Sequence, residues 1–151
     1  MDKNQALSKA MALCSRRECS EADIRGKLKF WGTLHEDIDW IIGELIKEKF
    51  IDDLRFTIAY VRDKIRLNQW GRIKIRYMLS MEKVKHSIID QALEKIDEDL
   101  YTETLKELLQ KKARELKNES NPYNKKQKLI KFAQGRGFEV DMVLKELKDL
   151  T

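Results

Sequence analysis

The stretch from residue 52 to residue 67 constrains the fold more than any other part of this chain, because it reads as a helix with apolar residues on two faces. At about 100° per residue, one face of this helix carries Phe56, Ala59, Tyr60 and Leu67. A second face, roughly opposite to part of the first, carries Ile58, Val61 and Ile65. A helix with two apolar faces packs against neighbours on both. We therefore expect this helix to join two packed units, with Phe56 and Tyr60 largely buried.

The same stretch carries polar signals at its start and along one edge. Asp52 and Asp53 are expected to accept hydrogen bonds from the first free backbone N–H groups and to oppose the positive end of the helix dipole. Arg55, Arg62 and Arg66 fall within about 40° of one another around the helix axis. These three guanidinium groups could act together on one phosphate track or acidic surface, or they could be paired locally and solvated.

Composition favours a helical protein with a large solvated surface. The chain has 151 residues, of which 38% are charged, with one proline and six glycines. This length is about that of one domain. We expect an elongated all-α array rather than a deep globule or a β-sandwich. The net charge of +5 and an isoelectric point near 9.1 favour an acidic partner such as a polynucleotide.

Cysteines, histidines and apolar runs predict a cytoplasmic chain without a metal site or a membrane span. The start of the chain is polar and lacks the apolar region of a secretory signal. No apolar run approaches the ~20 residues that span a bilayer. Cys14 and Cys19 form a C-x4-C pair, and His35 and His86 lie far from them. Because a zinc site needs a second pair of ligands at close spacing, we predict structural cysteines, no metal and no cofactor.

The first 51 residues read as three helices around one core. We expect a first helix over residues 4–17 and a second that begins at the capping-box pattern Ser20–Asp23 and ends at Gly32. A third is expected over residues 35–49, with a regular apolar stripe that comprises Ile38, Ile41, Ile42, Leu45 and Ile46. Three helices with one shared core make a unit.

The same three-helix pattern occurs twice more. Each turn between the second and third helix of a unit is flanked by apolar residues six positions apart, namely Leu28 and Leu34, Met78 and Val84, and Phe132 and Phe138. The later member of each pair recurs after 50 and then 54 residues, a spacing near that of helical repeat proteins. We predict three tandem three-helix repeats, at residues 1–51, 52–97 and 98–151, with a hinge at residues 97–99.

Two helices joined by a short turn with glycine also outline a helix-turn-helix DNA-binding motif. A recognition helix has to approach phosphates, yet residues 35–49 contain five acidic residues against two lysines, and residues 139–149 contain four against two. The third helices of these repeats are therefore poor candidates for reading a DNA groove.

The positive charge is concentrated in two other stretches. Residues 62–76 contain six bases and one acid, and residues 111–136 contain nine bases and two acids. This segregation favours an acidic partner, whereas any single lysine in it is more simply explained as part of a solvated face. Trp70 lies within the first stretch and could stack on a nucleobase, anchor a partner or belong to the core.

The sequence holds no signature of a catalytic site. The two histidines stand apart, neither cysteine lies in a nucleophile motif, and the phosphate-binding loop, nucleophile-elbow and zinc-protease patterns are absent. We therefore predict that the protein is not an enzyme.

Four segments are similar to motifs of one known family. Residues 15–28 read SRRECSEADIRGKL, residues 52–62 read DDLRFTIAYVR, and residues 71–76 and 136–138 read GRIKIR and RGF. They resemble the SRREHS-type opening, the DDxRFAxxYV segment and later motifs of the bacterial RecX family, which modulates the RecA recombinase. The chain departs from the family where Arg72 replaces a common proline, Cys19 a usual histidine, and Ser80 and Met81 a Lys-Gly turn.

The resemblance implies a tandem three-helix-repeat protein that lies in the helical groove of the RecA filament on single-stranded DNA. There it would limit filament extension, ATP hydrolysis and strand exchange, and so act in homologous recombination, DNA repair and the SOS response. Carried over by motif, the binding residues that it implies are Arg16, Arg17, Arg25, Lys27, Arg55, Arg62, Arg72, Lys74 and Arg76. The basic stretches add Arg66, Lys128, Lys131 and Arg136.

Three hypotheses of function remain open from the sequence. The first is a monomeric regulator of the RecA filament that binds single-stranded DNA, and also double-stranded DNA in a wider form of the hypothesis. The second is a stand-alone basic nucleic-acid-binding module that needs no protein partner. The third is a structural scaffold for another helical protein. Salt dependence separates the first two, because a pure phosphate binder loses affinity steeply with salt.

Overall fold

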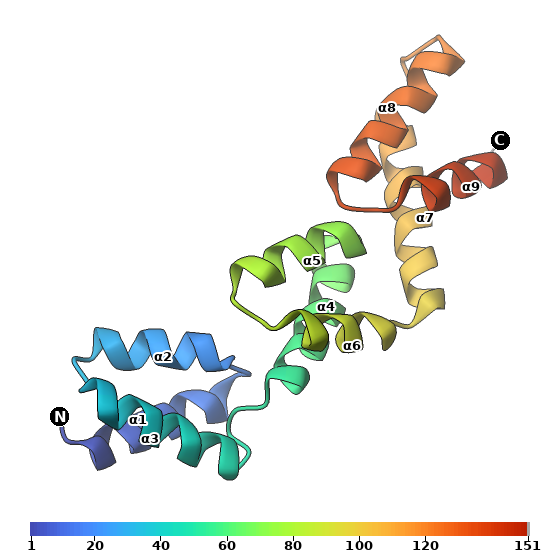
Figure 1. Ribbon diagram of the computed structural model, residues 1–151. Helices are drawn as coiled ribbons and strands as arrows, with labels where there is room; N and C mark the ends of the chain where they lie inside the picture. Colours follow the sequence, from blue (N-terminus) through green and yellow to red (C-terminus); the bar gives the residue numbers. More distant parts are fainter. Residues whose placement is uncertain (151) are drawn as a thin grey trace. The chain divides into compact units, whose positions relative to one another are not determined.

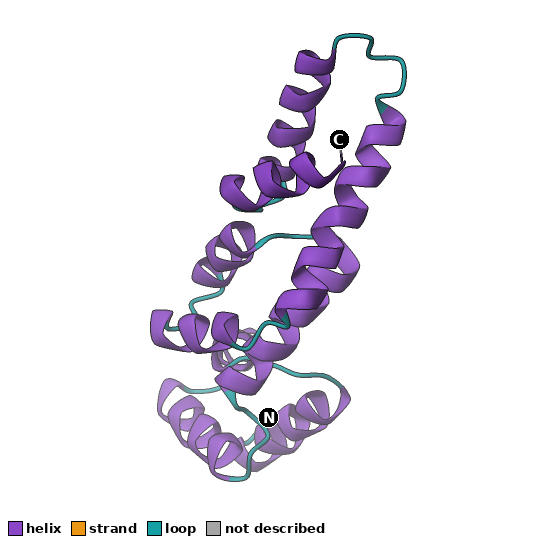
Figure 2. Cartoon of the chain, turned by 90° about the vertical axis from the view of Figure 1, so that its right-hand side faces the viewer, coloured by secondary structure: helices purple, strands orange, loops and turns teal. Residues whose placement is uncertain are grey.

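The computed structural model describes residues 1–150, which form nine α-helices and no strand (Figures 1 and 2). In chain order these are α1 (Lys3–Arg16), α2 (Glu21–Phe30), α3 (His35–Lys47), α4 (Asp53–Asn68), α5 (Arg72–Met81), α6 (His86–Glu94), α7 (Glu98–Glu115), α8 (Pro122–Gly135) and α9 (Val140–Leu150). The all-α prediction is confirmed, and α1, α3 and α4 begin and end within two residues of their expected bounds. Across residues 1–150, none of the helices combines the length and the apolarity needed to cross a membrane.

The chain forms two compact units. The first contains residues 1–60 and 79–92, and the second contains residues 61–78 and the chain from residue 93 onward. Helix α4 contributes its first half to one unit and its second half to the other. The prediction that this helix serves two packed units is therefore confirmed.

In the first unit, α1, α2 and α3 enclose one core. Local signals set their ends. The Ser20 hydroxyl accepts the N–H of Asp23 at 3.0 Å, while the Asp23 carboxylate accepts the N–H of Ser20 at 3.3 Å, which confirms the predicted capping box. Gly32 ends α2 with a φ of 80°, a value that glycine adopts without strain. The core between the helices comprises Ala6, Ala10, Cys19, Ile24, Leu28, Ile38, Ile41, Ile42, Leu45 and Ile51.

Two details of the first unit differ from the sequence prediction. Ile46 is 47% exposed, because it lies about 100° around α3 from the buried Leu45 and so beyond the edge of the apolar stripe. Asp52 does cap α4, accepting the N–H of Arg55 at 3.0 Å. Asp53, in contrast, accepts the N–H of Glu21, the first residue of α2, at 2.9 Å. Asp53 therefore ties the start of α2 to the start of α4, and burial raises the pKa of its carboxyl group.

The two apolar faces of α4 are less buried than predicted. Phe56 and Tyr60 are half-buried rather than largely buried, with ring centroids 6.0 Å apart. Val61 and Ile65 are buried, as expected. Leu67 is 76% exposed, because two helical residues beyond Ile65 amount to about 200° and place it on the opposite side.

The second unit contains the helices α7, α8 and α9, together with the second half of α4 and most of α5. Its core comprises Tyr101, Leu105, Leu108, Leu109, Leu129, Ala133, Phe138, Val143 and Leu147. Asn121 caps α8 by accepting the N–H groups of Tyr123 and Asn124, and Pro122 follows at the first helical position, where no N–H is needed.

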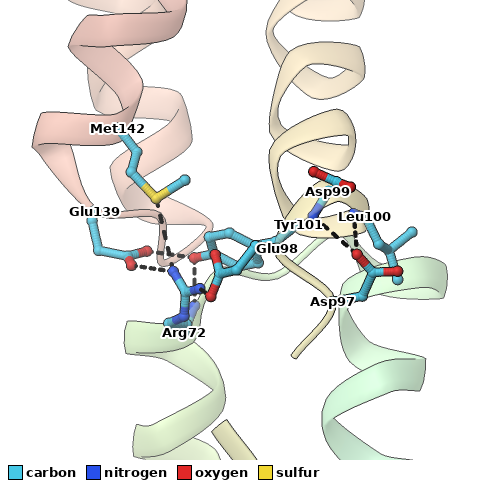
Figure 3. Close-up of polar contacts among 8 residues, drawn as sticks. All are labelled: Arg72, Asp97, Glu98, Asp99, Leu100, Tyr101, Glu139 and Met142. Atoms are coloured by element: carbon cyan, nitrogen blue, oxygen red, sulfur yellow. Dashed lines mark hydrogen bonds and ion pairs between the residues drawn. The ribbon is translucent and has the colours of Figure 1, made fainter. Parts of the chain in front are cut away.

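The hinge predicted at residues 97–99 is instead an ordered helix start. The Asp97 carboxylate accepts the N–H groups of Asp99 and Leu100 at 3.0 and 3.2 Å (Figure 3). Glu98 and Asp99 lie in the first turn of α7, where negative charge opposes the positive end of the helix dipole. The acidic run therefore begins a helix and does not loosen the chain.

Candidate functional site

Two turns of the second unit are joined by backbone hydrogen bonds. The N–H of Gly71 donates to the carbonyl of Arg136 at 2.8 Å, and the N–H of Ile73 donates to the carbonyl of Gly137 at 3.0 Å. Glycine is required on both sides: a Cβ on Gly71 would lie 2.5 Å from the backbone nitrogen of Phe138, and Gly137 has a φ of 96°. The start of α5 is thereby held against the turn between α8 and α9.

Arg72, next to this contact, is matched by two carboxylates within the unit (Figure 3). Its guanidinium pairs with Glu139 at 2.7 Å and also with Glu98, and it lies 4.0 Å from the centroid of the Tyr101 ring. The backbone N–H of Arg72 donates to the Tyr101 hydroxyl at 2.9 Å, and that hydroxyl donates to Glu139. Burial, with the hydrogen bond to Glu139, raises the pKa of Tyr101. Arg72 thus fixes α5 to α7 and α9.

Arg136 fixes the end of α4 in a similar way. Its Nε donates to the carbonyl of Gln69 at 3.4 Å, and its Nη2 donates to the carbonyl of Asn68. Carbonyl groups at the end of a helix have no partner within the helix and carry partial negative charge. The guanidinium therefore stabilises the turn that leads into Trp70.

Trp70 lies between two lysines. The Nζ of Lys64 is 4.9 Å and the Nζ of Lys74 is 4.6 Å from the centroid of the indole, distances at which the ring attracts a cation. The indole is half-buried. The indole thus packs partly into the unit, and two half-buried lysines lie beside its ring.

A small groove next to this turn is also lined by bases. It has a volume of about 190 Å³ and is lined by Gln69, Leu108, Lys111, Lys112, Glu115, Phe132 and Arg136. Lys112 pairs with Glu115 at 3.4 Å and lies 4.8 Å from the centre of the Phe132 ring. Three bases therefore border the groove against one acid.

Together these residues form what we call the Trp70–Arg136 surface, which comprises Lys64, Trp70, Lys74, Lys111, Lys112, Phe132 and Arg136. Its two parts are continuous through Gln69, which lines the groove and precedes Trp70 in the chain. Ammonium and guanidinium groups bind phosphates, and aromatic rings next to them stack on nucleobases. The arrangement is suited to a nucleic-acid backbone or another extended anion.

The predicted binding residues of the first unit fall into two kinds. Arg16, Arg17 and Lys27 are exposed. Arg25 pairs with Glu21 at 3.2 Å and Asp39 at 2.8 Å. Arg55 pairs with Glu18 at 2.7 Å and donates to the carbonyl groups of Lys49 and Phe50. Arg25 and Arg55 therefore also have structural roles within this unit.

The second unit contains all of the other predicted bases. Arg62 lies 3.8 Å from Asp63, and both side chains are exposed. Lys128 pairs with Glu119 at 2.6 Å, which lowers the pKa of that carboxyl group. Arg66, Arg76 and Lys131 are exposed.

Sequence reasoning missed the carboxylates and the tyrosine that hold Arg72. The sequence pattern indicates a hinge at Glu98 and only a helix charge at Glu139, and it gives no signal for Tyr101. The signal that could have revealed them is the RGF segment followed by Glu139, since a glycine in the first basic stretch and a glycine directly after the second permit a close backbone contact.

Within residues 1–150, no group of three or more histidine, cysteine, aspartate or glutamate residues is placed to hold a metal ion. Cys14 and Cys19 are free thiols.

Comparison with protein families identifies two segments of the chain. Residues 52–93 match the second three-helix domain of RecX, and residues 98–146 match the third. These matches agree with the all-α prediction, because each is to a domain of three helices.

Relatives and a solved structure agree with these matches. The regulatory protein RecX of Clostridium acetobutylicum is 32% identical over 94% of this chain and 68% of its own length. That of Chlorobaculum tepidum is 32% identical over 97% of this chain and 88% of its own length. The crystal structure of RecX from Lactobacillus salivarius matches with a TM-score of 0.89 at 22% identity, over 98% of this chain and 96% of that one. The last comparison concerns the fold alone.

Proposed function

Because this chain belongs to the RecX family of non-enzymatic regulatory proteins, we propose that it binds the RecA filament on single-stranded DNA and restrains the recombinase and ATPase activities of that filament. It would thereby modulate homologous recombination and DNA repair, including the SOS response, in the cytoplasm. Its partners would be RecA and DNA, and no cofactor is required.

The observation that carries this proposal is the Trp70–Arg136 surface. Lysines from three helices and one arginine gather there around Trp70 and a small groove. Basic side chains that border an aromatic ring suit contact with phosphates and nucleobases at the same time. Such a surface can bind DNA within a filament, with protein contacts made by other faces.

We propose that the binding residues combine this surface with the exposed bases elsewhere in the chain. The proposed set from the sequence comprises Arg16, Arg17, Arg25, Lys27, Arg55, Arg62, Arg66, Arg72, Lys74, Arg76, Lys128, Lys131 and Arg136. Among these, Arg72 would act by positioning α5, because its charge is already matched by Glu98 and Glu139. Lys64, Lys111 and Lys112 join the set because they lie beside Trp70 or the groove.

Three tandem repeats are part of the same proposal. The boundaries at residues 1–51, 52–97 and 98–151 are supported by the family matches at residues 52–93 and 98–146. Each repeat would supply one three-helix element to the filament.

A stand-alone nucleic-acid-binding module is the alternative. The experiment that tests the proposal measures binding of the full chain to single-stranded DNA alone and to the RecA filament on the same DNA, across a salt series. A pure phosphate binder loses affinity with a slope set by its phosphate contacts. Under our proposal, the chain keeps much of its affinity for the filament at high salt. RecA-driven ATP hydrolysis falls when the chain is added. Equal affinity for DNA and filament at every salt concentration would establish the alternative.

A charge variant with a matched control locates the site. Lys74→Gln with Lys111→Gln removes two charges from the Trp70–Arg136 surface, and Lys95→Gln with Lys145→Gln removes two exposed charges from the same unit outside it. The first pair should weaken inhibition of ATP hydrolysis and the control pair should not. Equal inhibition by both would place the contact elsewhere.

A further inference from the structure

A second groove, with a volume of about 630 Å³, opens in the second unit between the end of α7, the start of α8 and the end of α9. No residue that lines it belongs to the Trp70–Arg136 surface or to the small groove there. Its volume lies within the range of ligand-binding pockets in proteins, roughly 300–1,000 Å³.

The floor of this groove is apolar. Leu129 and Leu147 are buried at its base, and Ala113, Pro122 and Leu150 continue the apolar lining. Tyr123 also lines the groove and is 69% exposed. An exposed aromatic side chain beside an apolar hollow is typical of an anchor for a protein partner.

The rim of the same groove is basic. Arg114 of α7, Lys125 and Lys126 of α8, and Lys148 of α9 line it, and none of the described lining residues is acidic. Bases from three helices therefore surround an apolar floor. Such a field attracts an acidic partner and orients it.

We propose that this groove binds an acidic amphipathic helix of a partner protein. A helix of that kind places apolar side chains at positions i, i+3, i+4 and i+7 on the floor, while glutamates and aspartates on its flanks meet the basic rim. A nucleic-acid strand meets the rim equally well but offers no apolar side chains to cover the floor of the groove. A second copy of this chain is disfavoured, because each copy carries a net charge of +5.

This inference goes beyond the proposed function, since it concerns a separate groove and a different class of ligand. DNA binding at the Trp70–Arg136 surface and peptide binding in this groove can each fail without the other.

The test uses the full chain and a fluorescent peptide of about 16 residues, or roughly four helical turns, with leucines on one face and glutamates on the flanks. Anisotropy titrations would compare it with a scrambled peptide of the same composition and with a version that has lysine in place of glutamate. We expect micromolar binding of the first peptide and affinity at least about tenfold lower for each of the other two.

Two charge variants with the same net change place the peptide. Lys125→Glu with Lys126→Glu reverses the rim, and Lys117→Glu with Lys145→Glu reverses two exposed lysines of the same unit that do not line the groove. Tyr123→Ala removes the aromatic edge without touching the core. The rim pair and Tyr123→Ala should weaken binding at least about tenfold, and the control pair should leave it within about twofold.

Several results would overturn the proposal. Equal binding of the scrambled peptide would mean that charge alone attracts it. Equal losses in the rim and control pairs would place the peptide elsewhere. Displacement of the peptide by an oligothymidylate from the unmodified chain, but not from Lys125→Glu with Lys126→Glu, would assign the groove to nucleic acid. Self-association of the chain that the rim pair abolishes would assign it to a second copy.

Discussion

The Tyr101 hydroxyl accepts the backbone N–H of Arg72 at 2.9 Å and donates to the Glu139 carboxylate. One buried hydroxyl thus links the start of α5, the first turns of α7 and the start of α9. The Tyr101 ring also packs against Phe138, with centroids 5.2 Å apart, and lies under the Arg72 guanidinium. The second unit is therefore organised around this residue.

Removing only that hydroxyl should destabilise the protein. Tyr101→Phe keeps the ring but leaves the N–H of Arg72 and one oxygen of Glu139 without their partner, at a cost of about 1–3 kcal/mol. Thermal and denaturant unfolding followed by circular dichroism would measure the loss. Tyr77→Phe, at a tyrosine that is 63% exposed, is the control and should change nothing. Equal stability of the two variants would show that the Tyr101 hydroxyl contributes nothing to the stability of the unit.

Glycine substitutions should have opposite effects at two positions of the same unit. In Gly71→Ala the new Cβ meets the backbone of Gly137 and Phe138, so the two turns separate and stability falls by more than about 2 kcal/mol. In Gly135→Ala nothing lies within 4 Å of the new Cβ. Because Gly135 is helical, that change should raise stability by about 0.5–1 kcal/mol. Denaturant titrations of both variants check this, and a stable Gly71→Ala would contradict the close contact.

Local features of this fold could be predicted from the sequence, because neighbouring residues carry them. The capping box at Ser20 depends on residues three positions apart, and the apolar stripes depend on helical periodicity. The interactions of Arg72 connect residues 26 and 67 positions away, and no local pattern marks such pairs. Asp53 illustrates the same limit: it looks like the cap of its own helix and yet serves α2, 32 residues earlier.

The candidate site was predictable only in part for the same reason. The two basic stretches were visible as charge runs, and Trp70 stood out between Lys64 and Lys74. Whether each base faces solvent or a carboxylate depends on tertiary packing. The structure therefore divides the predicted set into matched bases, such as Arg72 and Arg25, and exposed ones, such as Arg66 and Lys131.

The Cys14 thiol should be unreactive at neutral pH. Burial, with contributions from nearby Cys19 and Glu18, raises its pKa from 9.0 to about 11. The thiolate is the reactive form, so at pH 8 the fraction of thiolate falls about 100-fold below that of an ordinary cysteine. Iodoacetamide labelling of the unmodified chain, followed at Cys14 by mass spectrometry of the peptide that contains it, should be slow at pH 8 and should accelerate up to pH 11. A rate that levels off near pH 9 would contradict the raised pKa.

Removing charge from the exposed end of α4 should separate binding from stability. Arg62→Gln with Arg66→Gln affects two exposed side chains, and the pairing of Arg62 with Asp63, 3.8 Å away, is a surface contact that contributes at most about 1 kcal/mol. Helicity and melting temperature should therefore stay unchanged. If both residues contact phosphates, the salt dependence of filament binding should flatten by about one unit of slope for each lost contact, and inhibition of RecA should weaken.

Arg72→Gln is the informative contrast, because it removes the partner of Glu98 and Glu139 and should lower the melting temperature. Unchanged inhibition by the Arg62 and Arg66 double variant at equal concentration would assign these two residues to solubility and leave Lys74, Lys111 and Arg136 as the contact surface.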